Sequence, residues 1–432
     1  MRTLLKYLAV AALALRVTAS GQTTAIRCGT LIDGLSDAPR KNAVVLVDGK
    51  TITSVGTEIP PGVRVIDLSG ATVLPGLIDA HTHVLLQGDV TEEDYDEQLL
   101  KESIPYRTLR ATVSCRTALL NGFTTLRDME TEGAMYADVD LKKAIARGVI
   151  DGPRLFVSTR SINTTGHYPL PNSLYAWELH MPKGVQEVTG QAEARRAVRE
   201  QLSYGADWIK VYADRGYYRA VDGTFHSLPN FTDEELRAIG DEVHASRRHF
   251  AAHAVAREGI IPAINAGATS IEHGFAMDDE CIALMVRKGV YWCPTIYVNV
   301  YVAEGRAAAG NPANKELLDV QPVVFAKALK AGVKIAFGTD VGGFPWTENE
   351  AKEFPYMVKW GMTPMQAIRS ATVVAAELLD MKGKIGEISP GAFADIIAVE
   401  GDPLEHVEAL QQVKFVMKEG KVYKNEVGAR GQ

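Results

Sequence analysis

The sequence predicts an α/β fold, a (β/α)₈ TIM-like barrel with a small discontinuous β-sandwich domain formed by both chain ends. Three observations support this prediction. The middle of the chain repeats a unit in which a helical pattern, a glycine and a short apolar run follow one another. Both ends carry short β-type runs separated by turn residues. No GxGxxG or Walker sequence, the mark of many open nucleotide-binding sheets, occurs in the 432 residues.

The two chain ends predict one composite β-sandwich, built from residues 23–75 and 380–425 around a barrel of residues 76–379. Turn pairs such as Asp48-Gly49 and Pro61-Gly62 separate its β-type runs near the amino terminus. The expected strands of both ends are Ala43–Val47, Thr51–Val55, Val63–Leu68, Ala71–Leu74, Ala394–Val399, Val413–Met417 and Lys421–Tyr423.

Eight strands are expected in the barrel, and glycines precede most of them. A glycine just past a helix adopts the left-handed conformation that ends the helix, so each unit is expected to be a helix followed by a strand. The expected strands are Leu77–His83, Phe123–Asp128, Pro153–Ser158, Trp208–Tyr212, Phe250–His253, Ser270–His273, Val290–Pro294 and Val333–Asp340. The long stretch Thr159–Gly190 is expected to form a lid over the barrel mouth.

The amino terminus predicts a cleaved secretory signal in residues 1–20, so we expect an exported protein, periplasmic or secreted. Arg2 and Lys6 precede the apolar run Leu8–Leu15, and small residues follow it. Arg16 leaves the cleavage site open, and the alternative is a cytosolic start with a chance apolar run.

Composition favours a small-molecule partner. The net charge of −7 is spread without long like-charge blocks, so we expect neither nucleic-acid binding nor a membrane patch. No later apolar run reaches the ~20 residues that span a bilayer. The four cysteines show no CxxC spacing and are expected to be core thiols.

Histidines collect at the expected carboxyl ends of the barrel strands, where catalytic groups of such barrels lie. His81 and His83 point to the same side of a strand because side chains alternate. His253, His273 and Asp340 each end another expected strand. Imidazoles and a carboxylate are the ligands that zinc prefers when no thiolate is available.

Lys210 interrupts the apolar run Trp208–Tyr212, and alternation directs its side chain into the barrel. An unpaired ammonium is costly there. One interpretation pairs Lys210 with Asp128 or Asp340. The other is that CO₂ converts the amine to a carbamate, an anionic ligand with two oxygens that can bridge two metal ions.

Five motifs together resemble the amidohydrolase superfamily along the whole barrel, including the split β-sandwich. They are Gly76-Leu77-Ile78-Asp79-Ala80-His81-Thr82-His83, Ile209-Lys210, Ala252-His253-Ala254, Ile271-Glu272-His273-Gly274 and Gly338-Thr339-Asp340. Residues 122–128, Thr165-Gly166-His167 and Lys210-Val211-Tyr212 are similar to its imidazolonepropionase-like branch, which contains Xaa-Pro dipeptidases, carboxypeptidase-like dipeptidases and ochratoxin-hydrolysing amidases. Thr165-Gly166 replaces the two glycines usual in that branch.

The resemblance implies two Zn²⁺ ions bridged by carboxylated Lys210 and a hydroxide. His81, His83 and Asp340 would hold one ion with Lys210, and His253 and His273 would hold the other. Asp340 would act as the catalytic base. A homo-oligomer, and an octamer by family resemblance, is also implied.

The resemblance also suggests residues that contact the substrate. His167 is a candidate donor to the developing oxyanion. Tyr212 is a candidate for binding a substrate carboxylate, with Arg215 and Arg160 as further candidates.

The leading function hypothesis is hydrolysis of the amide bond of N-acyl amino acids or dipeptides. Four aromatic residues and a proline in the expected mouth loops favour a leaving amino acid with an aromatic or otherwise apolar side chain, as in the phenylalanine amide ochratoxin A; they are Tyr175, Trp177, Phe344, Pro345 and Trp346. The alternatives are a mononuclear imidazolonepropionase-like hydrolase of cyclic amides, a deaminase and a lactonase. A scaffold protein without catalysis is disfavoured because every ligand position is filled.

Overall fold

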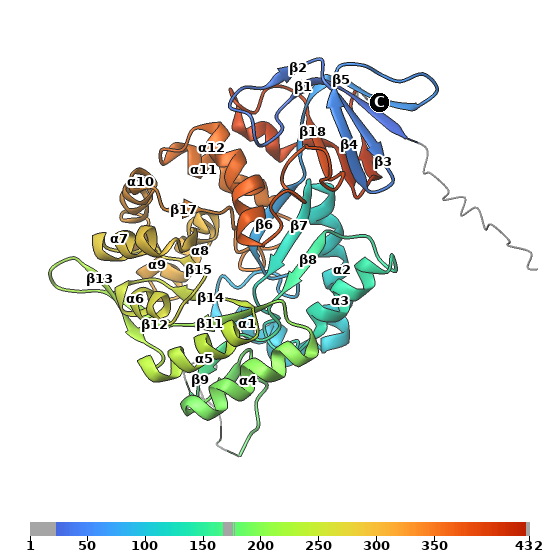
Figure 1. Ribbon diagram of the computed structural model, residues 1–432. Coiled ribbons are helices and arrows are strands. Elements are labelled where there is room, and N and C mark those ends of the chain that lie inside the picture. Colours follow the sequence, from blue (N-terminus) through green and yellow to red (C-terminus); the bar gives the residue numbers. More distant parts are fainter. Residues whose placement is uncertain (1–22, 167–175, 177, 429–432) are drawn as a thin grey trace, which may run out of the picture.

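The computed structural model describes residues 23–166, 176 and 178–428, and it confirms the predicted fold class (Figure 1). Eight strands of the barrel follow one another in parallel, with helices outside them. They are β6 (Leu77–Thr82), β7 (Phe123–Asp128), β8 (Arg154–Val157), β11 (Trp208–Tyr212), β14 (His249–Ala254), β15 (Ser270–His273), β16 (Tyr291–Cys293) and β17 (Lys334–Ile335).

Backbone hydrogen bonds close the ring between strands that the ladders leave unpaired. At one seam the Asp207 amide donates to the Val157 carbonyl over 2.8 Å, which joins β8 to β11. At the other, the amides of Ala80 and Asp340 donate to the carbonyls of Phe337 (2.9 Å) and His81 (2.8 Å). The carboxyl ends of the strands therefore lie around one opening.

The helices between these strands bury apolar faces against the barrel. They are α2 (Ile104–Leu120), α3 (Ala137–Ala146), α4 (Gly190–Tyr204), α5 (Asp233–Ala245), α6 (Arg257–Asn265), α7 (Asp279–Lys288), α8 (Ile296–Ala308), α9 (Ala313–Leu317), α10 (Gln321–Ala331), α11 (Glu353–Lys359), α12 (Pro364–Arg369) and α13 (Ala375–Leu378), with α1 (Glu92–Asp96) before them. Helices α4 and α7 end at Gly205 and Gly289, whose φ angles of 113° and 69° are the left-handed values expected for helix-ending glycines.

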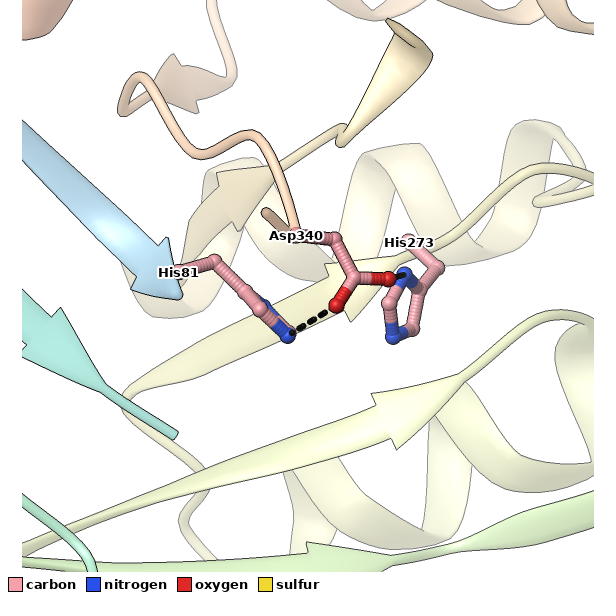
Figure 2. A group of neighbouring side chains, drawn as sticks. All are labelled: His81, His273 and Asp340. Carbon is pink, nitrogen blue, oxygen red and sulfur yellow. Dashed lines mark ion pairs between the residues drawn. The ribbon is translucent and has the colours of Figure 1, made fainter. Parts of the chain in front are cut away.

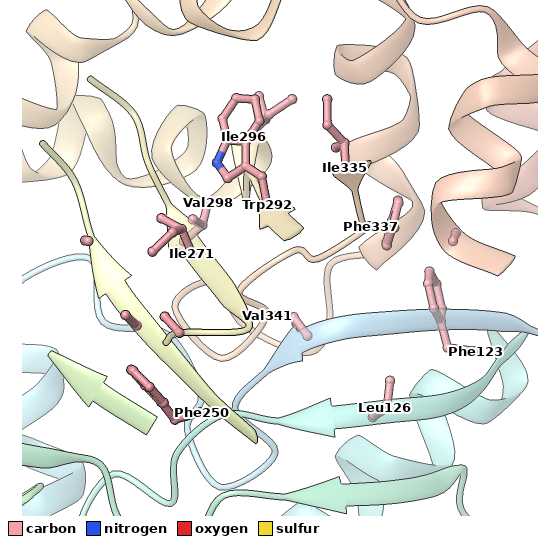
Figure 3. Close-up of a cluster of buried hydrophobic side chains, with 14 of the residues drawn as sticks. Phe123, Leu126, Phe250, Ile271, Trp292, Ile296, Val298, Ile335, Phe337 and Val341 are labelled. Atoms are coloured by element: carbon pink, nitrogen blue, oxygen red, sulfur yellow. The ribbon is translucent and has the colours of Figure 1, made fainter. Parts of the chain in front are cut away.

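A continuous core lies between the strands and these helices. Side chains of β7, β14, β15 and β16 meet residues of α8 and of the segment after β17 (Figure 3). Phe123 and Phe337 are fully buried with ring centroids 5.6 Å apart. All four cysteines are buried and free, as predicted. None of the helices in the described ranges has the length and apolar character that crossing a bilayer requires.

Strands from both chain ends form one eight-stranded sheet beside the barrel, seen in blue and red at the top of Figure 1. Parallel pairing of β1 with β5 and antiparallel pairing of β5 with β18 join the two ends. The strands are β1 (Thr24–Leu31), β2 (Arg40–Lys41), β3 (Val44–Asp48), β4 (Thr51–Gly56), β5 (Arg64–Pro75), β18 (Ile396–Val399), β19 (Val413–Lys418) and β20 (Lys421–Asn425).

Three features differ from the predicted elements. The runs 63–68 and 71–74 form a single strand, β5, with a register irregularity opposite Cys28. The last barrel strand is only β17, because residues 336–340 leave regular pairing and Asp340 adopts a left-handed φ of 62°. An unpredicted hairpin follows β11 and projects from the barrel, formed by β12 (Asp214–Arg219) and β13 (Phe225–Pro229).

The expected lid contains two short strands in its described part. They are β9 (Ile162–Thr164) and β10 (Gln186–Val188), which pair with each other in parallel. Val211 of β11 pairs with Ile162, so this segment extends the barrel sheet at its carboxyl end.

We predict that Arg154→Met destabilises the contact between barrel and end sheet by about 2–4 kcal/mol, because it leaves a buried carboxylate without its cation. Arg154 donates to Asp395 over 2.8 Å and to Glu419 over 2.9 Å, and the Asp395 side chain is 2% exposed. Urea unfolding measures the change. Arg27→Met removes an exposed pair with Asp67 and should cost less than about 1 kcal/mol; equal losses in the two variants would contradict the prediction.

The buried Glu350 carboxyl group is expected to make the free energy of unfolding depend on pH. It is fully buried, and burial raises its pKa to about 7, although Asn121 donates to it. The folded state therefore retains a proton that the unfolded state loses, and wild-type stability falls as the pH rises from about 4.5 to 7. Glu350→Gln should gain about 2 kcal/mol relative to wild type between pH 5 and pH 8. Urea midpoints at both pH values measure this, and Glu304→Gln, at an exposed carboxylate, should show no such trend.

Candidate metal centre

Five strand ends of the barrel position the six predicted ligands around one opening. His81 lies at the end of β6, and His83 follows the strand by one residue. Lys210 is the third residue of β11, and its neighbour in register is Ala251 of β14. His253 is near the end of β14, where it pairs with Tyr212, and His273 ends β15. Asp340 lies in the irregular segment after β17.

His81, His273 and Asp340 form the centre of the cluster (Figure 2). One donor atom from each lies within 4.8 Å of the other two. The Asp340 carboxylate lies between the two rings, 3.4 Å from His81 Nε2 and 3.9 Å from His273 Nδ1. His83 Nε2 approaches the same carboxylate to 3.0 Å. Three imidazoles from two strands therefore converge on one acid.

The remaining two ligands lie beside this centre. The His253 ring is 4.5 Å from the His273 ring, measured between centroids. Lys210 is 1% exposed and lines the same cavity as His83, His253 and Asp340. The structure thus brings all six predicted ligands to one place.

Lys210 has no acidic partner among the described residues. Its ammonium lies 5.5 Å from the centre of the Tyr212 ring, and neither Asp128 nor Asp340 is within salt-bridge distance. The interpretation that pairs Lys210 with one of these carboxylates is therefore wrong. Burying a charged amine without a counter-charge costs free energy. The position of Lys210 therefore favours a reaction that removes the positive charge of its amine.

The charges of the cluster suit metal ligands. Burial and the nearby Lys210 ammonium lower the pKa of His253 to about 3, so its ring is neutral. Burial and His253 also hold the pKa of His273 well below its usual range. Burial opposes ionisation of Asp340, but His81 and His83 keep the pKa of this acid low. Although burial opposes it, the Asp340 carboxylate raises the pKa of His83 to about 9, so this ring has to give up a proton when it binds a metal. His253 and His273 are already in the neutral form that binds divalent metals.

One atom is left without a hydrogen-bond partner at the centre. His81 Nε2 is buried and makes no hydrogen bond, although it faces the cluster. Buried polar atoms are usually satisfied, so an orphaned nitrogen beside a carboxylate is a position that a cation fits. Tight backbone packing supports this geometry: a Cβ on Gly338 would lie 2.9 Å from His81 Cβ, and one on Gly342 would lie 2.5 Å from the His83 carbonyl oxygen.

Three acids that contact the ligands were not assigned a role from the sequence. Glu272 accepts from His81 Nδ1 over 2.7 Å. The Glu130 carbonyl lies 3.3 Å from His83 Nδ1, and the Glu132 carboxylate lies 3.5 Å from the same nitrogen. A signal for two of them exists, because acids alternate from the last residue of β7 onward, at Asp128, Glu130 and Glu132, where side chains meet the barrel mouth.

The cluster opens into a cavity of about 570 Å³. Two predicted substrate contacts, Tyr212 and Arg215, line it. The Tyr212 hydroxyl donates to Glu130 over 3.0 Å, and Arg215 donates to the Pro229 carbonyl over 3.2 Å. Arg306 of α8 also lines the cavity and pairs with Asp89 over 3.2 Å, a contact that the sequence did not indicate.

Other predicted contacts do not face this cavity. Arg160 is absent from its lining and donates to the Val185 carbonyl over 2.8 Å. The prediction that Phe344 and Trp346 line the mouth is wrong: Phe344 is fully buried against Tyr297, and Trp346 is 4% exposed. Apolar rings in short loops pack into the core when a helix, here α8, covers them. His167, Tyr175 and Trp177 lie outside the described residues.

Comparison with known proteins gives consistent matches along the chain. Residues 72–423 match the model of the Amidohydrolase family. Ochratoxinase from Aspergillus niger is 32% identical over 441 aligned residues, which cover 94% of this chain and 88% of that protein. Its crystal structure, 30% identical, has a TM-score of 0.80 and covers 94% of this chain and 96% of that one.

Two further relatives are similar over most of their length. The crystal structure of a Xaa-Pro dipeptidase with methionine bound in the active site is 35% identical, with a TM-score of 0.82, and covers 93% of this chain and 100% of that one. Imidazolonepropionase from Salinispora arenicola is 25% identical over 390 residues, which cover 87% of this chain and 90% of that protein.

Proposed function

The chain belongs to the amidohydrolase family, as a hydrolytic enzyme acting on amide bonds, and we propose that it is a binuclear zinc amidohydrolase of N-acyl amino acids or dipeptides. The observation that carries this proposal is the buried Lys210 amine, which has no acidic partner among the described residues and lines one cavity with His83, His253, His273 and Asp340.

The donor set divides into two groups that share Lys210. His81, His83 and Asp340 would hold one zinc ion, since both imidazoles approach the same carboxylate. His253 and His273 would hold the other, since their rings are neighbours on β14 and β15. Carboxylation of the Lys210 amine by CO₂ would turn a costly buried cation into an anionic ligand for both ions.

The chain's own residues supply the proton transfers. When bound, the zinc ions would lower the pKa of a water and polarise the scissile carbonyl. Asp340 is 18% exposed on its side chain, faces the cavity and is ionised, so it can accept a proton from the attacking water and pass it to the leaving nitrogen. His167 stays a predicted donor to the oxyanion.

The cavity suits a carboxylate-bearing amide with an apolar side chain. Arg215 and Arg306 bring guanidinium groups to its wall, and a guanidinium binds a carboxylate through two hydrogen bonds. Val255, Phe275 and Val298 line the same cavity and supply apolar surface. Relatives named ochratoxinase and Xaa-Pro dipeptidase support the same class, and phenylalanine amides such as ochratoxin A are suitable first substrates.

A panel of substrates tests this proposal. We expect hydrolysis of N-acyl amino acids and dipeptides, with kcat/KM higher for apolar than for acidic carboxy-terminal residues, measured by release of the free amino acid. Amidation of the terminal carboxylate should lower kcat/KM by at least about tenfold, because the guanidinium groups lose their partner. Turnover of cyclic amides, lactones or amino-substituted rings without turnover of any carboxylate-bearing amide would instead support the alternative hydrolase classes.

Metal content tests the role of Lys210. Wild type should retain two zinc ions per chain after dialysis, and Lys210→Ala should retain one or none and lose activity by at least about a thousandfold, because the bridging anion is missing. Acetate added to the variant should restore part of the metal content. Lys418→Ala removes another buried lysine, which bonds to the Gly152 carbonyl, and should retain both ions. A fully active Lys210→Ala variant with one tightly held ion would favour a mononuclear enzyme.

A further inference from the structure

A buried ion pair lies directly behind His81, on the side away from Asp340. Glu272 Oε2 is 2.7 Å from His81 Nδ1, and Glu272 Oε1 is 2.8 Å from Arg127 Nη2. All three side chains are 0% exposed. Water therefore cannot replace either partner. Glu272 Oε2 accepts from His81, and Glu272 Oε1 accepts from Arg127.

Arg127 is held in place by contacts on several sides. Its Nε donates to the Ala80 carbonyl over 2.6 Å and its Nη1 donates to Ser270 Oγ over 3.1 Å. The guanidinium also lies 4.5 Å from the centre of the Trp208 ring. Ser270 donates to the same Glu272 oxygen as Arg127 does. Glu272 thus cannot rotate away from His81 without breaking bonds that lack a substitute.

The Glu272 carboxylate determines which ring nitrogen of His81 carries the proton. A neutral imidazole has one N–H and one lone pair, and the nitrogen that faces a carboxylate has to be the donor. The lone pair of His81 is then on Nε2, the buried nitrogen without a hydrogen bond, 3.4 Å from Asp340. A lone pair and a carboxylate at this distance repel each other, and a cation between them removes the repulsion.

The other three imidazoles have weaker partners behind them. His83 Nδ1 faces the neutral carbonyl of Glu130 over 3.3 Å, and the Glu132 carboxylate lies farther away, at 3.5 Å. His273 Nδ1 is 2.8 Å from the Thr295 hydroxyl, which can donate or accept and so permits either tautomer. His253 makes no hydrogen bond among the described residues, and Asp214 lies 3.8 Å from its Nε2. On the side away from Asp340, His81 therefore makes the shortest contact to a carboxylate among the described ligand imidazoles, at 2.7 Å.

We propose that Glu272, anchored by Arg127, is a positioning residue that holds the His81 proton on Nδ1 and thereby makes Nε2 a metal ligand. This role rests on the proposed metal centre, and it adds that Glu272 raises the affinity of one of the two sites for zinc. The ion bound by His81 depends on Glu272, whereas the ion bound by His253 and His273 does not.

Glu272→Gln is the sharpest test because it changes the charge and little else. Its amide oxygen would accept from Arg127 and Ser270, so the amide NH₂ would face His81 Nδ1. That contact favours the tautomer with the proton on Nε2, which blocks metal binding. Zinc competition with a chromophoric chelator should show one dissociation constant raised 10–100-fold and the other unchanged within about twofold.

Glu258→Gln is the matched control. Glu258 accepts from His226 Nδ1 over the same 2.7 Å, but the pair is partly exposed and His226 does not line the cavity. Both zinc constants should stay as in wild type. Thermal unfolding of the metal-free proteins checks that each variant is folded.

The tautomer can be read in the wild-type protein without any variant. In metal-free protein with ¹⁵N-labelled histidine, the two-bond ¹H–¹⁵N pattern of His81, assigned by its absence in His81→Gln, should show the proton on Nδ1. A proton on Nε2 overturns the inference, and so does a Glu272→Gln variant that is folded and binds both ions as wild type does. A wild-type protein that binds no metal overturns the proposed function as well.

Discussion

The convergence of imidazoles on the Asp340 carboxylate is the contact on which the rest of the centre depends. Nitrogens of His81, His83 and His273 lie 3.0–3.9 Å from its oxygens, and they come from the ends of two strands, β6 and β15. Burial holds His253 and His273 neutral, whereas the Asp340 carboxylate raises the pKa of His83 to about 9. A divalent ion at the centre would take the place of the His83 proton beside this carboxylate.

The backbone around the cluster is held in uncommon conformations. Glu132, His273, Thr295 and Asp340 have φ angles of 49°, 73°, 45° and 62°, although none is glycine. Left-handed conformations of such residues cost of the order of 1 kcal/mol each and persist only where surrounding contacts fix them. Here they occur where strands turn into loops at the barrel mouth. The apolar core of the closed barrel stabilises the fold and so offsets the free-energy cost of these backbone conformations.

The cavity and the ligand cluster have different origins in the chain. The ligands come from strand ends, which the barrel hydrogen bonds keep in register. The walls come from loops: the hairpin of β12 and β13 contributes Arg215 and Tyr217, and α8 contributes Val298 and Arg306. Substrate preference can therefore change through loop residues while the chemistry of the strand ends stays the same.

The repeating pattern, the family and the six ligand candidates could be predicted from the amino-acid sequence alone. Local signals were sufficient, because glycines after helices, alternation within strands and residues at strand ends are properties of short segments. The pairing of the two chain ends was also readable, since both ends carry β-type runs that the barrel does not use. The β12–β13 hairpin is not among the predicted elements, although Asp222-Gly223 between its strands is a turn pair typical of hairpins.

The side chains that hydrogen-bond to the metal ligands could not be predicted from the sequence and are seen only in the folded structure. Glu272 lies next to His273 in sequence but hydrogen-bonds to His81, 191 residues away, and Arg127 reaches Glu272 across the barrel interior. Barrel closure likewise leaves Lys210 without an acidic partner among the described residues and places Phe344 and Trp346 in the core. Partners of this kind are set by the closure of the barrel, because closure brings non-neighbouring strands into contact, and no local pattern records which side chains then meet.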